Sequence, residues 1–331
     1  MREEKVRIPR IVTERNSDLS EIPTRWQAFI FWLLNDGRYL DRKPGRSPRA
    51  LDPWRLIPFI AIHLGCLAVI WVGVSWFAVA LAVSLYLIRM FLITAFYHRF
   101  FAHRAFESSR VFRFIVALLG CTAGQRGPLW WASHHRQHHI HSDTDLDPHS
   151  PQKDSFWFSH VIWFLTRDAF SVRWGHIKDL QKFKELVWLE RFDWLPLVGL
   201  AAFCFWLGDF TAKVQPTWNT SGLQALVWGF FVSTTFLYHA TYTINSLAHR
   251  YGQRRFETPD HSRNNFFLAL LTLGEGWHNN HHRYPGAARQ GFYWWELDLS
   301  YLGLRVLRRL GLVWNLRQVP SKILEAGRAR H

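Results

Sequence analysis

The chain has 331 residues, enough for one large domain or two small ones. Its hydrophobic content of 49% and charged content of 20% are ordinary for a globular protein, but the apolar residues are concentrated in blocks. The formal net charge is +15. Nucleic-acid binding is one explanation of such a charge, yet no nucleic-acid-binding motif accompanies it and the basic residues lie beside apolar segments. We therefore expect no nucleic-acid partner, and we attribute the charge to contact with anionic lipid head groups.

The three cysteines exclude a disulfide framework and a thiolate metal site. Cys66, Cys121 and Cys204 each lie in an apolar stretch without CxxC spacing, so we expect small buried side chains. Tryptophan (19) and phenylalanine (27) are both abundant. Such an aromatic excess suits membrane interfaces and long apolar cavities.

Residues 1–50 form a basic, proline-containing segment. Its start is polar for too long to be a signal peptide. Within it, Trp26–Leu34 is apolar but too short to cross a bilayer, so we expect a helix that lies at the membrane surface.

Two pairs of apolar segments follow, and each pair predicts a helical hairpin across a membrane. Each segment approaches the roughly 20 apolar residues that a spanning helix needs. A polar, histidine-rich segment, 98–192, separates the pairs and contains an apolar piece, Val111–Gly124, which we place at the membrane surface. The sequence thus predicts an all-α integral membrane domain over residues 51–300 and a basic C-terminal segment over 301–331. The four expected spans cover residues 54–71, 76–97, 194–207 and 223–245.

The distribution of basic residues predicts the topology. Lysine and arginine crowd the N-terminal, central and C-terminal segments, whereas the hairpin tips have almost none. In the second tip, residues 208–222, Lys213 is the only basic residue. By the positive-inside rule, both termini and the histidine-rich segments of this multi-pass protein should face the cytoplasm.

Histidines cluster in four short motifs: HRFFAH, HHRQHH, NSLAH and HNNHH. Two of them contain a triad at positions i, i+3 and i+4, which share one face of a helix. We expect two helices that each present three imidazoles to a common point, at the cytoplasmic rim of the spans. The two triads are His135, His138 and His139, and His278, His281 and His282.

This constellation predicts a metal centre. Imidazole suits Fe, Cu, Zn and Ni, and nine ligands are too many for one ion and about right for two. A single histidine is more often an ordinary hydrogen-bonded residue, but two triads and an HxxxxH motif beside membrane spans favour ligands. Glu275 and His278 form one Glu-x-x-His pair, whereas carboxylate di-iron bundles need two such pairs and further glutamates.

With these motifs the chain resembles the integral-membrane fatty-acid desaturases of the stearoyl-CoA Δ9 type. The boxes HRFFAH, HRQHH and HNNHH match in order and spacing, as do NSLAH and SDTDLDPHSP, and the similarity covers about residues 50–300. The resemblance implies that nine histidines bind two irons, that Asn245 reaches one iron through water, and that no side chain beyond the metal ligands is catalytic. The implied ligands are His98, His103, His135, His138, His139, His249, His278, His281 and His282.

The chain departs from the family's acyl-CoA enzymes around the head-group site. Ser133 and His134 replace an Arg-Asp pair, Arg126 replaces an Asn, Arg167 is followed by Asp168 rather than Lys, and Tyr242 replaces a Trp. The acyl carrier therefore stays open between CoA, lipid and acyl-carrier protein. The stretch Gln125–Trp131 resembles the bacterial branch, which implies a bacterial inner membrane. We expect substrate contacts from Arg126, Trp131, Arg167 and Tyr242.

The implied reaction is the O2-dependent insertion of a cis double bond in mid-chain, at Δ9, inside a bent tunnel between the spans. By resemblance, Ala82 and Tyr86 on the second span form the tunnel floor, although ordinary helix packing explains each residue as well. No heme, flavin or nicotinamide motif occurs in the 331 residues. Two electrons must then come from a partner such as a ferredoxin, rubredoxin or cytochrome b5.

Several polar residues keep two interpretations. His63 and His239 lie inside predicted spans, where we favour neutral, hydrogen-bonded packing over function. Asp143, Asp145 and Asp147 either orient the ligand imidazoles or form a solvated acidic turn. Arg89 can extend toward the cytoplasmic surface.

Two alternative functions remain at this stage. A membrane di-iron hydroxylase or alkane mono-oxygenase would share the metal chemistry, and its product would be an alcohol rather than an alkene. A membrane metal carrier or sensor would need ligands along a path through the bilayer, whereas these histidines cluster at one rim.

Overall fold

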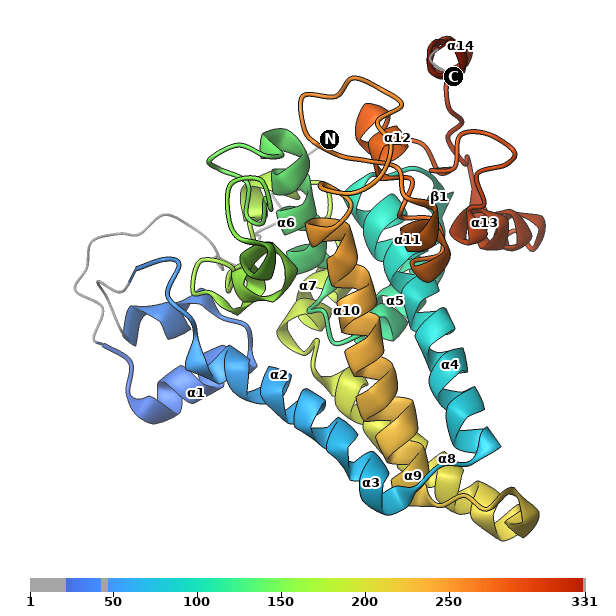
Figure 1. The fold of residues 1–331 in the computed structure, drawn as a ribbon. Coiled ribbons are helices and arrows are strands. Elements are labelled where there is room, and N and C mark those ends of the chain that lie inside the picture. Colours follow the sequence, from blue (N-terminus) through green and yellow to red (C-terminus); the bar gives the residue numbers. More distant parts are fainter. Residues whose placement is uncertain (1–21, 43–46, 330–331) are drawn as a thin grey trace, which may run out of the picture.

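The structure is a computed structural model that describes residues 22–42 and 47–329. It is mostly helical, with the apolar hairpins extending from one side of a helical cap, which consists of residues 103–193 and 247–329 (Figure 1). Residues 1–21 of the N-terminal segment lie outside the described residues. The expected helix is present as α1, Arg25–Leu33, which Thr24 caps by accepting a hydrogen bond from the Gln27 backbone N–H. Its place at a membrane surface stays a prediction.

The first hairpin consists of α2 (Pro53–Gly65), η2 (Cys66–Ala68) and α3 (Val69–Val72), followed by α4 (Trp76–Phe91) and the π-helical segment η3 (Leu92–Ala102). The chain reverses at Gly73, whose φ of 67° favours glycine. By length and composition, Pro53–Val72 and Trp76–Ala102 can each cross a membrane. The second helix is longer than predicted, so that His98 lies inside it and not after it.

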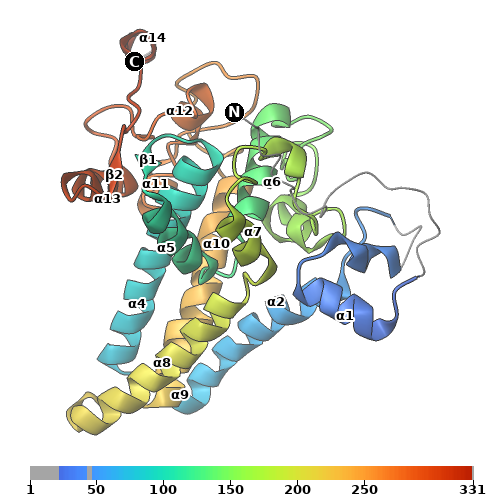
Figure 2. The same ribbon diagram turned by 180° about the vertical axis from the view of Figure 1, so that it is seen from behind.

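The second hairpin consists of α8 (Leu195–Val214), η7 (Pro216–Trp218), α9 (Gly222–Leu226), η8 (Val227–Val232, π-helical) and α10 (Ser233–Ser246). Trp194–Val214 is the third candidate span, and it extends past the predicted end. Within the extension, Asp209 and Lys213 pair at 2.7 Å. In Figure 2, α8 runs from the cap to the far end of the hairpins.

The fourth predicted span is a continuous helical run, Gly222–Ser246, packed against α4 and α8. It is not among the candidate spans of the described residues. Its second half carries serine, threonine, tyrosine and histidine side chains, which lower its hydropathy. Three of the four predicted spans are therefore confirmed as long and apolar enough.

Polar groups inside the hairpins bond to one another. The buried Arg89 guanidinium donates to Thr234 Oγ1 at 2.7 Å and to Ser233, so the prediction that it extends to the surface is wrong. His63 Nε2 lies 3.1 Å from His239 Nε2, and His239 Nδ1 lies 3.1 Å from His160 Nε2. These contacts agree with the hydrogen-bonded packing that we favoured for His63 and His239.

The cap holds the histidine motifs, and a two-stranded sheet of β1 (Glu107–Ser108) and β2 (Val313–Trp314) ties its two halves together. The largest hydrophobic core joins η3 to the first cap helices through residues such as Phe96, Phe101, Leu129 and Leu186. This core fixes the end of the second span against the cap. The cap helices are α5 (Arg110–Cys121), α6 (Pro128–His141), η4 (Phe158–Ile162), η5 (Trp163–Leu165), η6 (Trp174–His176), α7 (Lys184–Arg191), α11 (Phe266–Leu271), α12 (His278–Arg283), α13 (Leu299–Arg309) and α14 (Ser321–Arg328).

Candidate metal centre

Four elements bring the nine histidines together. The end of η3 supplies two, α6 supplies three, the turn after α10 supplies one, and α12 supplies three. The start of α6 is held by Glu190, whose carboxylate accepts hydrogen bonds from the Leu129 and Trp130 backbone N–H groups. Sequence reasoning did not find this contact, because Glu190 lies about 60 residues away on α7.

The nine histidines form two groups, and within each group the ring nitrogens lie within 4.8 Å of one another. Among the described residues, a third group of this kind joins His149 and Asp147 to His138. The five-histidine cluster contains His98, His103, His135, His139 and His281. The four-histidine cluster contains His138, His249, His278 and His282.

The two triads do not face one common point, contrary to our expectation. On α6, His135 and His139 join the five-histidine cluster and His138 joins the other; on α12, His278 and His282 join the four-histidine cluster and His281 joins the other. At about 100° per residue, positions i and i+4 point in directions about 40° apart, whereas i+3 diverges by about 60° from i and 100° from i+4. Each helix therefore serves both clusters, with its i, i+4 pair in one and its i+3 residue in the other.

The spacing of the ring nitrogens fits bound metal ions. Nε2 atoms lie 2.8 Å apart for His103 and His135, 2.9 Å for His139 and His281, and 3.0 Å for His249 and His278. Two imidazole nitrogens bound at about 2.1 Å to one ion, at right angles, would lie about 3 Å apart. Each cluster could thus hold one ion through Nε2 atoms.

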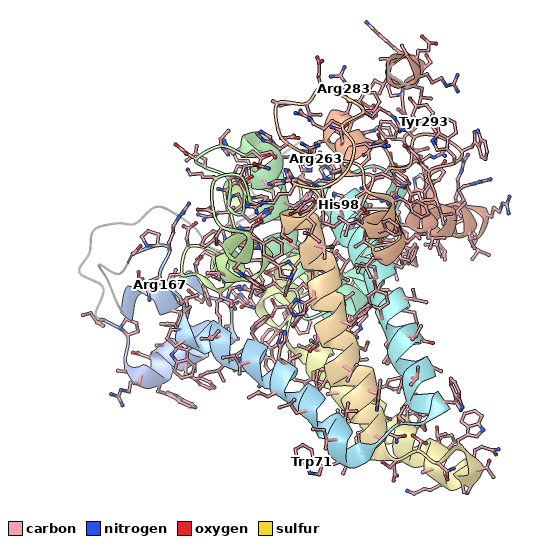
Figure 3. The ribbon with its side chains drawn as sticks, in the orientation of Figure 1. Trp71, His98, Arg167, Arg263, Arg283 and Tyr293 are labelled. Atoms are coloured by element: carbon pink, nitrogen blue, oxygen red, sulfur yellow. The ribbon has the colours of Figure 1, made fainter. Side chains whose placement is uncertain are left out.

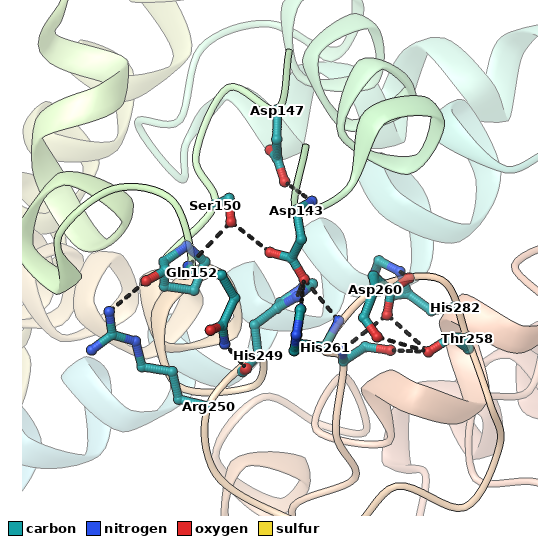
Figure 4. Close-up of polar contacts among 12 residues, drawn as sticks. Asp143, Asp147, Ser150, Gln152, His249, Arg250, Thr258, Asp260, His261 and His282 are labelled. Atoms are coloured by element: carbon teal, nitrogen blue, oxygen red, sulfur yellow. Dashed lines mark hydrogen bonds and ion pairs between the residues drawn. The ribbon is translucent and has the colours of Figure 1, made fainter. Parts of the chain in front are cut away.

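Buried carboxylates orient the rings of the four-histidine cluster. Asp147 lies 3.0 Å from His138 Nδ1. Asp143 lies 3.0 Å from His249 Nδ1, and Asp260 lies 2.7 Å from His282 Nδ1 (Figure 4). An Nδ1–H donated to a carboxylate leaves Nε2 free to bind a metal. Of the three aspartates with two interpretations, Asp143 and Asp147 contact ligand-type histidines.

The third aspartate and the single Glu-x-x-His pair have other contacts. Asp145 is exposed and pairs with Lys153. Glu275 contacts His98 Nδ1 and also pairs with Arg99 at 3.1 Å. Gln290 Nε2 lies 3.2 Å from His98 Nδ1, a contact for which the sequence gives no signal.

Electrostatics keep most of these imidazoles neutral. Burial, reinforced by the neighbouring histidines, holds the pKa of five of them well below the ordinary value, and burial lowers the pKa of His282 to about 4. His138 is the exception, because Asp147 outweighs burial and raises its pKa. Neutral imidazoles have a free lone pair, so the clusters suit metal ions that prefer nitrogen ligands. The five are His103, His135, His139, His278 and His281.

A cavity of about 360 Å³ lies beside the clusters, between α1, α2, α6 and α10. Arg126, Trp131, Tyr242 and Asn245 line it, together with His135 and largely aromatic neighbours. A second cavity of about 50 Å³ reaches both clusters and shares four lining residues with the first: Trp131, His135, Thr241 and Asn245.

Three predicted substrate residues do not line either of these cavities. Arg167 donates to the Leu40 carbonyl oxygen at 2.7 Å. Ala82 and Tyr86 are buried on α4, where the Tyr86 ring packs at 4.8 Å from the Phe236 ring. His134 does line the larger cavity, with Nε2 3.2 Å from the Ser171 carbonyl oxygen.

The fold and the site define a class: a helical protein with apolar hairpins and a buried, histidine-rich pair of metal-type clusters beside an apolar cavity. The family model "Fatty acid desaturase" matches residues 74–305, more than half of the chain. The chain therefore belongs to the fatty acid desaturase family, as its motifs predicted.

Relatives that are named for different desaturase activities share similar sequence identity with this chain. The chain is 37% identical over 222 residues to the "Acyl-CoA 5-desaturase AL21" of Anemone leveillei, a match that covers 66% of this chain and 64% of the relative. It is 35% identical over 223 residues to the "sn-2 palmitoyl-lipid 9-desaturase" of Nostoc sp. (strain 36), covering 66% and 73%. It is 34% identical over 222 residues to the "Delta-9 acyl-lipid desaturase 2" of Arabidopsis thaliana, covering 66% and 67%. The match thus spans less than two thirds of the Anemone enzyme.

Proposed function

We propose that the chain is an O2-dependent fatty-acyl desaturase that inserts a cis double bond in mid-chain. The observation that carries the proposal is the pair of buried histidine clusters beside the 360 Å³ cavity, in a chain of this family. The balanced reaction removes two hydrogens from a CH2–CH2 pair and consumes O2, two electrons and two protons to give an alkene and two waters. Both electrons come from an external carrier.

Two iron ions would complete the centre, one in each cluster. Iron supplies the O2-derived oxidant that an unactivated CH2 group requires. The nine histidines would hold the ions, the carboxylates of Asp143, Asp147 and Asp260 would fix the rings, and Asn245 would contact one ion through water. The aromatic wall of the cavity keeps bulk water away from the reacting carbons.

The cavity is the proposed acyl site. In this proposal, Trp131 and Tyr242 pack against the acyl chain near the five-histidine cluster. Arg126 lines the same cavity, farther from the histidines, and pairs with Asp193 at 3.0 Å. We place Arg126 at the head-group end, with Arg167 outside it, and the methyl end toward Ala82 and Tyr86. The position that we propose is Δ9, supported by the relatives named as 9-desaturases, although relatives named as 5-desaturases are equally similar.

We also propose four membrane spans, with Gly222–Ser246 as the fourth, and the histidine clusters on the cytoplasmic side of a bacterial inner membrane. The more polar helix is tolerated because its polar groups bond to Arg89, His63 and His160. The domain limits remain 1–50, 51–300 and 301–331.

Expression in a desaturase-deficient bacterium tests the proposal. Mass spectrometry should locate a new double bond in the lipids, and feeding acyl-CoA, acyl-lipid and acyl-carrier-protein substrates to membranes identifies the carrier. An alcohol product would favour the hydroxylase alternative. Tight binding of two metal ions without any O2-dependent product would favour a metal carrier or sensor.

A further inference from the structure

A basic surface lies next to the four-histidine cluster. We define it by four arginines, Arg250, Arg254, Arg263 and Arg283, and call it the arginine face. Arg263 and Arg283 lie at the opposite end of the molecule from Trp71, which marks a hairpin tip (Figure 3). The face is therefore directed away from the membrane-spanning end, where a soluble protein can reach it.

No carboxylate among the described residues pairs with these four arginines. Arg254 donates to the Thr258 and Asp260 carbonyl oxygens at 2.8 Å, and Arg263 donates to the Gly252 carbonyl oxygen at 3.1 Å. On other surfaces, Arg38 and Arg110 pair with Asp36 and Glu185. The arginine face thus keeps its positive charge available for an acidic partner.

One exposed imidazole connects this face to the four-histidine cluster. The side chain of His261 is 51% exposed, and its Nδ1 lies 3.3 Å from Asp143 Oδ2. The same oxygen accepts from the His261 backbone N–H at 2.8 Å and lies 3.0 Å from His249 Nδ1 (Figure 4). A single buried carboxylate therefore joins a surface histidine to a cluster histidine.

The residue before His261 makes a parallel connection. Asp260 lies 2.7 Å from His282 Nδ1, so two neighbouring residues of one loop reach two histidines of the same cluster. The supports of the five-histidine cluster differ, because Arg99, Glu275 and Gln290 are all buried. His261 lies two residues before Arg263 of the arginine face, so this face has a connected route to the four-histidine cluster through Asp143.

We propose that the arginine face docks a small acidic one-electron carrier, and that electrons reach the four-histidine cluster through the His261–Asp143–His249 connection. The proposal rests on the proposed function, which requires two electrons per double bond from outside the chain. Each reduced carrier gives up one electron and is thereby oxidised, so two carriers dock in turn for each double bond. Opposite charges accelerate such brief encounters, and redox partners bury small interfaces that separate readily.

Charge reversal tests the docking without measuring desaturation. The probe is a reduced [2Fe–2S] ferredoxin with an acidic surface, and its binding to the detergent-purified protein is measured by biolayer interferometry at two salt concentrations. Arg254→Glu with Arg283→Glu should weaken binding about tenfold or more and remove most of its salt dependence. The control, Arg308→Glu with Arg309→Glu on α13, changes the net charge equally and should change affinity less than about twofold.

A second variant tests the connection itself. In the metal-loaded protein, His261→Ala should slow ferredoxin oxidation in stopped-flow absorbance while its affinity stays within about twofold, since the arginines remain. Equal weakening by both charge reversals would overturn the docking surface, as would no weakening by either. An unchanged oxidation rate in His261→Ala would overturn the connection. Lack of any product with dithionite as reductant would instead contradict the proposed function, whatever the binding result.

Discussion

The five-histidine and four-histidine clusters use the same kind of side chain but are held by different surroundings. Three aspartates contact Nδ1 atoms in the four-histidine cluster: Asp143, Asp147 and Asp260. Burial alone would raise the pKa of each, but hydrogen bonds and the nearby histidine charge outweigh burial and hold it below the ordinary value. These carboxylates are therefore ionised at neutral pH.

The five-histidine cluster has one carboxylate support, Glu275, and the buried Arg99 pairs with it. Arg99 also pairs with Asp298 at 2.9 Å, so it offsets the charge of Glu275 only in part. The five-histidine cluster thus has one supporting carboxylate where the four-histidine cluster has three. It lies instead at the cavity, where His135 forms part of the wall. The four-histidine cluster therefore has the ionised carboxylates that favour a bound cation. The five-histidine cluster instead forms part of the wall of the proposed acyl cavity.

The largest expected effect comes from removing one ligand from each cluster in turn. His138→Ala and His139→Ala should each abolish product, because the reaction needs both ions. Metal analysis of the purified variants should show that each loses the ion of its own cluster first. Retained desaturation in His138→Ala would refute its assignment as a ligand, and equal loss of both ions in both variants would show that the clusters do not act as separate sites.

The carboxylate supports should separate the clusters more finely. Removing an outer partner of a metal ligand typically costs about 10- to 100-fold in metal affinity or activity. Asp147→Asn should lie at the upper end of that range, because an ionised partner is lost. Glu275→Gln should lie at the lower end, because Arg99, which Glu275 shares with Asp298, offsets part of its charge. Competition with a metallochromic chelator measures both affinities; the reverse order would contradict the electrostatic comparison.

A third prediction concerns the cavity side. Tyr242→Ala removes part of the cavity wall and enlarges the cavity beside Asn245. It should raise KM for the acyl substrate several-fold while leaving the metal content unchanged. Tyr86→Ala should instead lengthen the preferred acyl chain, if the methyl end reaches α4. Gas chromatography of the products tests both variants together. An unchanged chain-length profile in Tyr86→Ala would remove α4 from the substrate site.

The sequence predicted which histidines gather better than it predicted their surroundings. The i, i+3, i+4 triads are local patterns, so a helix alone makes their side chains neighbours. The division of each triad between two clusters was missed, because it depends on how α6 and α12 face each other. Asp260 and Gln290 carry no motif and reach His282 and His98 only through tertiary contacts.

The bounds and the number of spans were harder to predict than their existence, because local hydropathy is not decisive near the ends of the helices or in the fourth segment. The helix of the second span continues through His98, because its last turns are buried against the cap. The run Gly222–Ser246 forms a helix whose polar groups bond to side chains of other helices. A hydropathy average over this segment alone cannot show such contacts.

The smallest effect on activity should come from replacing Glu190. This residue holds the start of α6, the helix that contributes histidines to both clusters. Burial and the charge of Asp193 raise its pKa to about 7. Since the folded-state pKa exceeds that of the unfolded chain, the protonated carboxyl is favoured by folding. Its contribution to stability is full below about pH 4.5 and is lost as the pH rises through about 7. Glu190→Gln, which keeps an oxygen for the Leu129 and Trp130 N–H groups, should remove this loss.

The difference between wild type and Glu190→Gln should therefore grow from pH 5 to pH 8, by a few degrees in Tm, with the variant the more stable at high pH. Activity at pH 7 should change less than about twofold, because the helix start keeps its hydrogen bonds. Differential scanning fluorimetry across that pH range measures the effect. The α6 histidines belong to both clusters. If Glu190→Gln lost metal from only one cluster, Glu190 would not support both clusters through α6. Parallel melting profiles would show that its carboxyl titrates as it does in the unfolded chain.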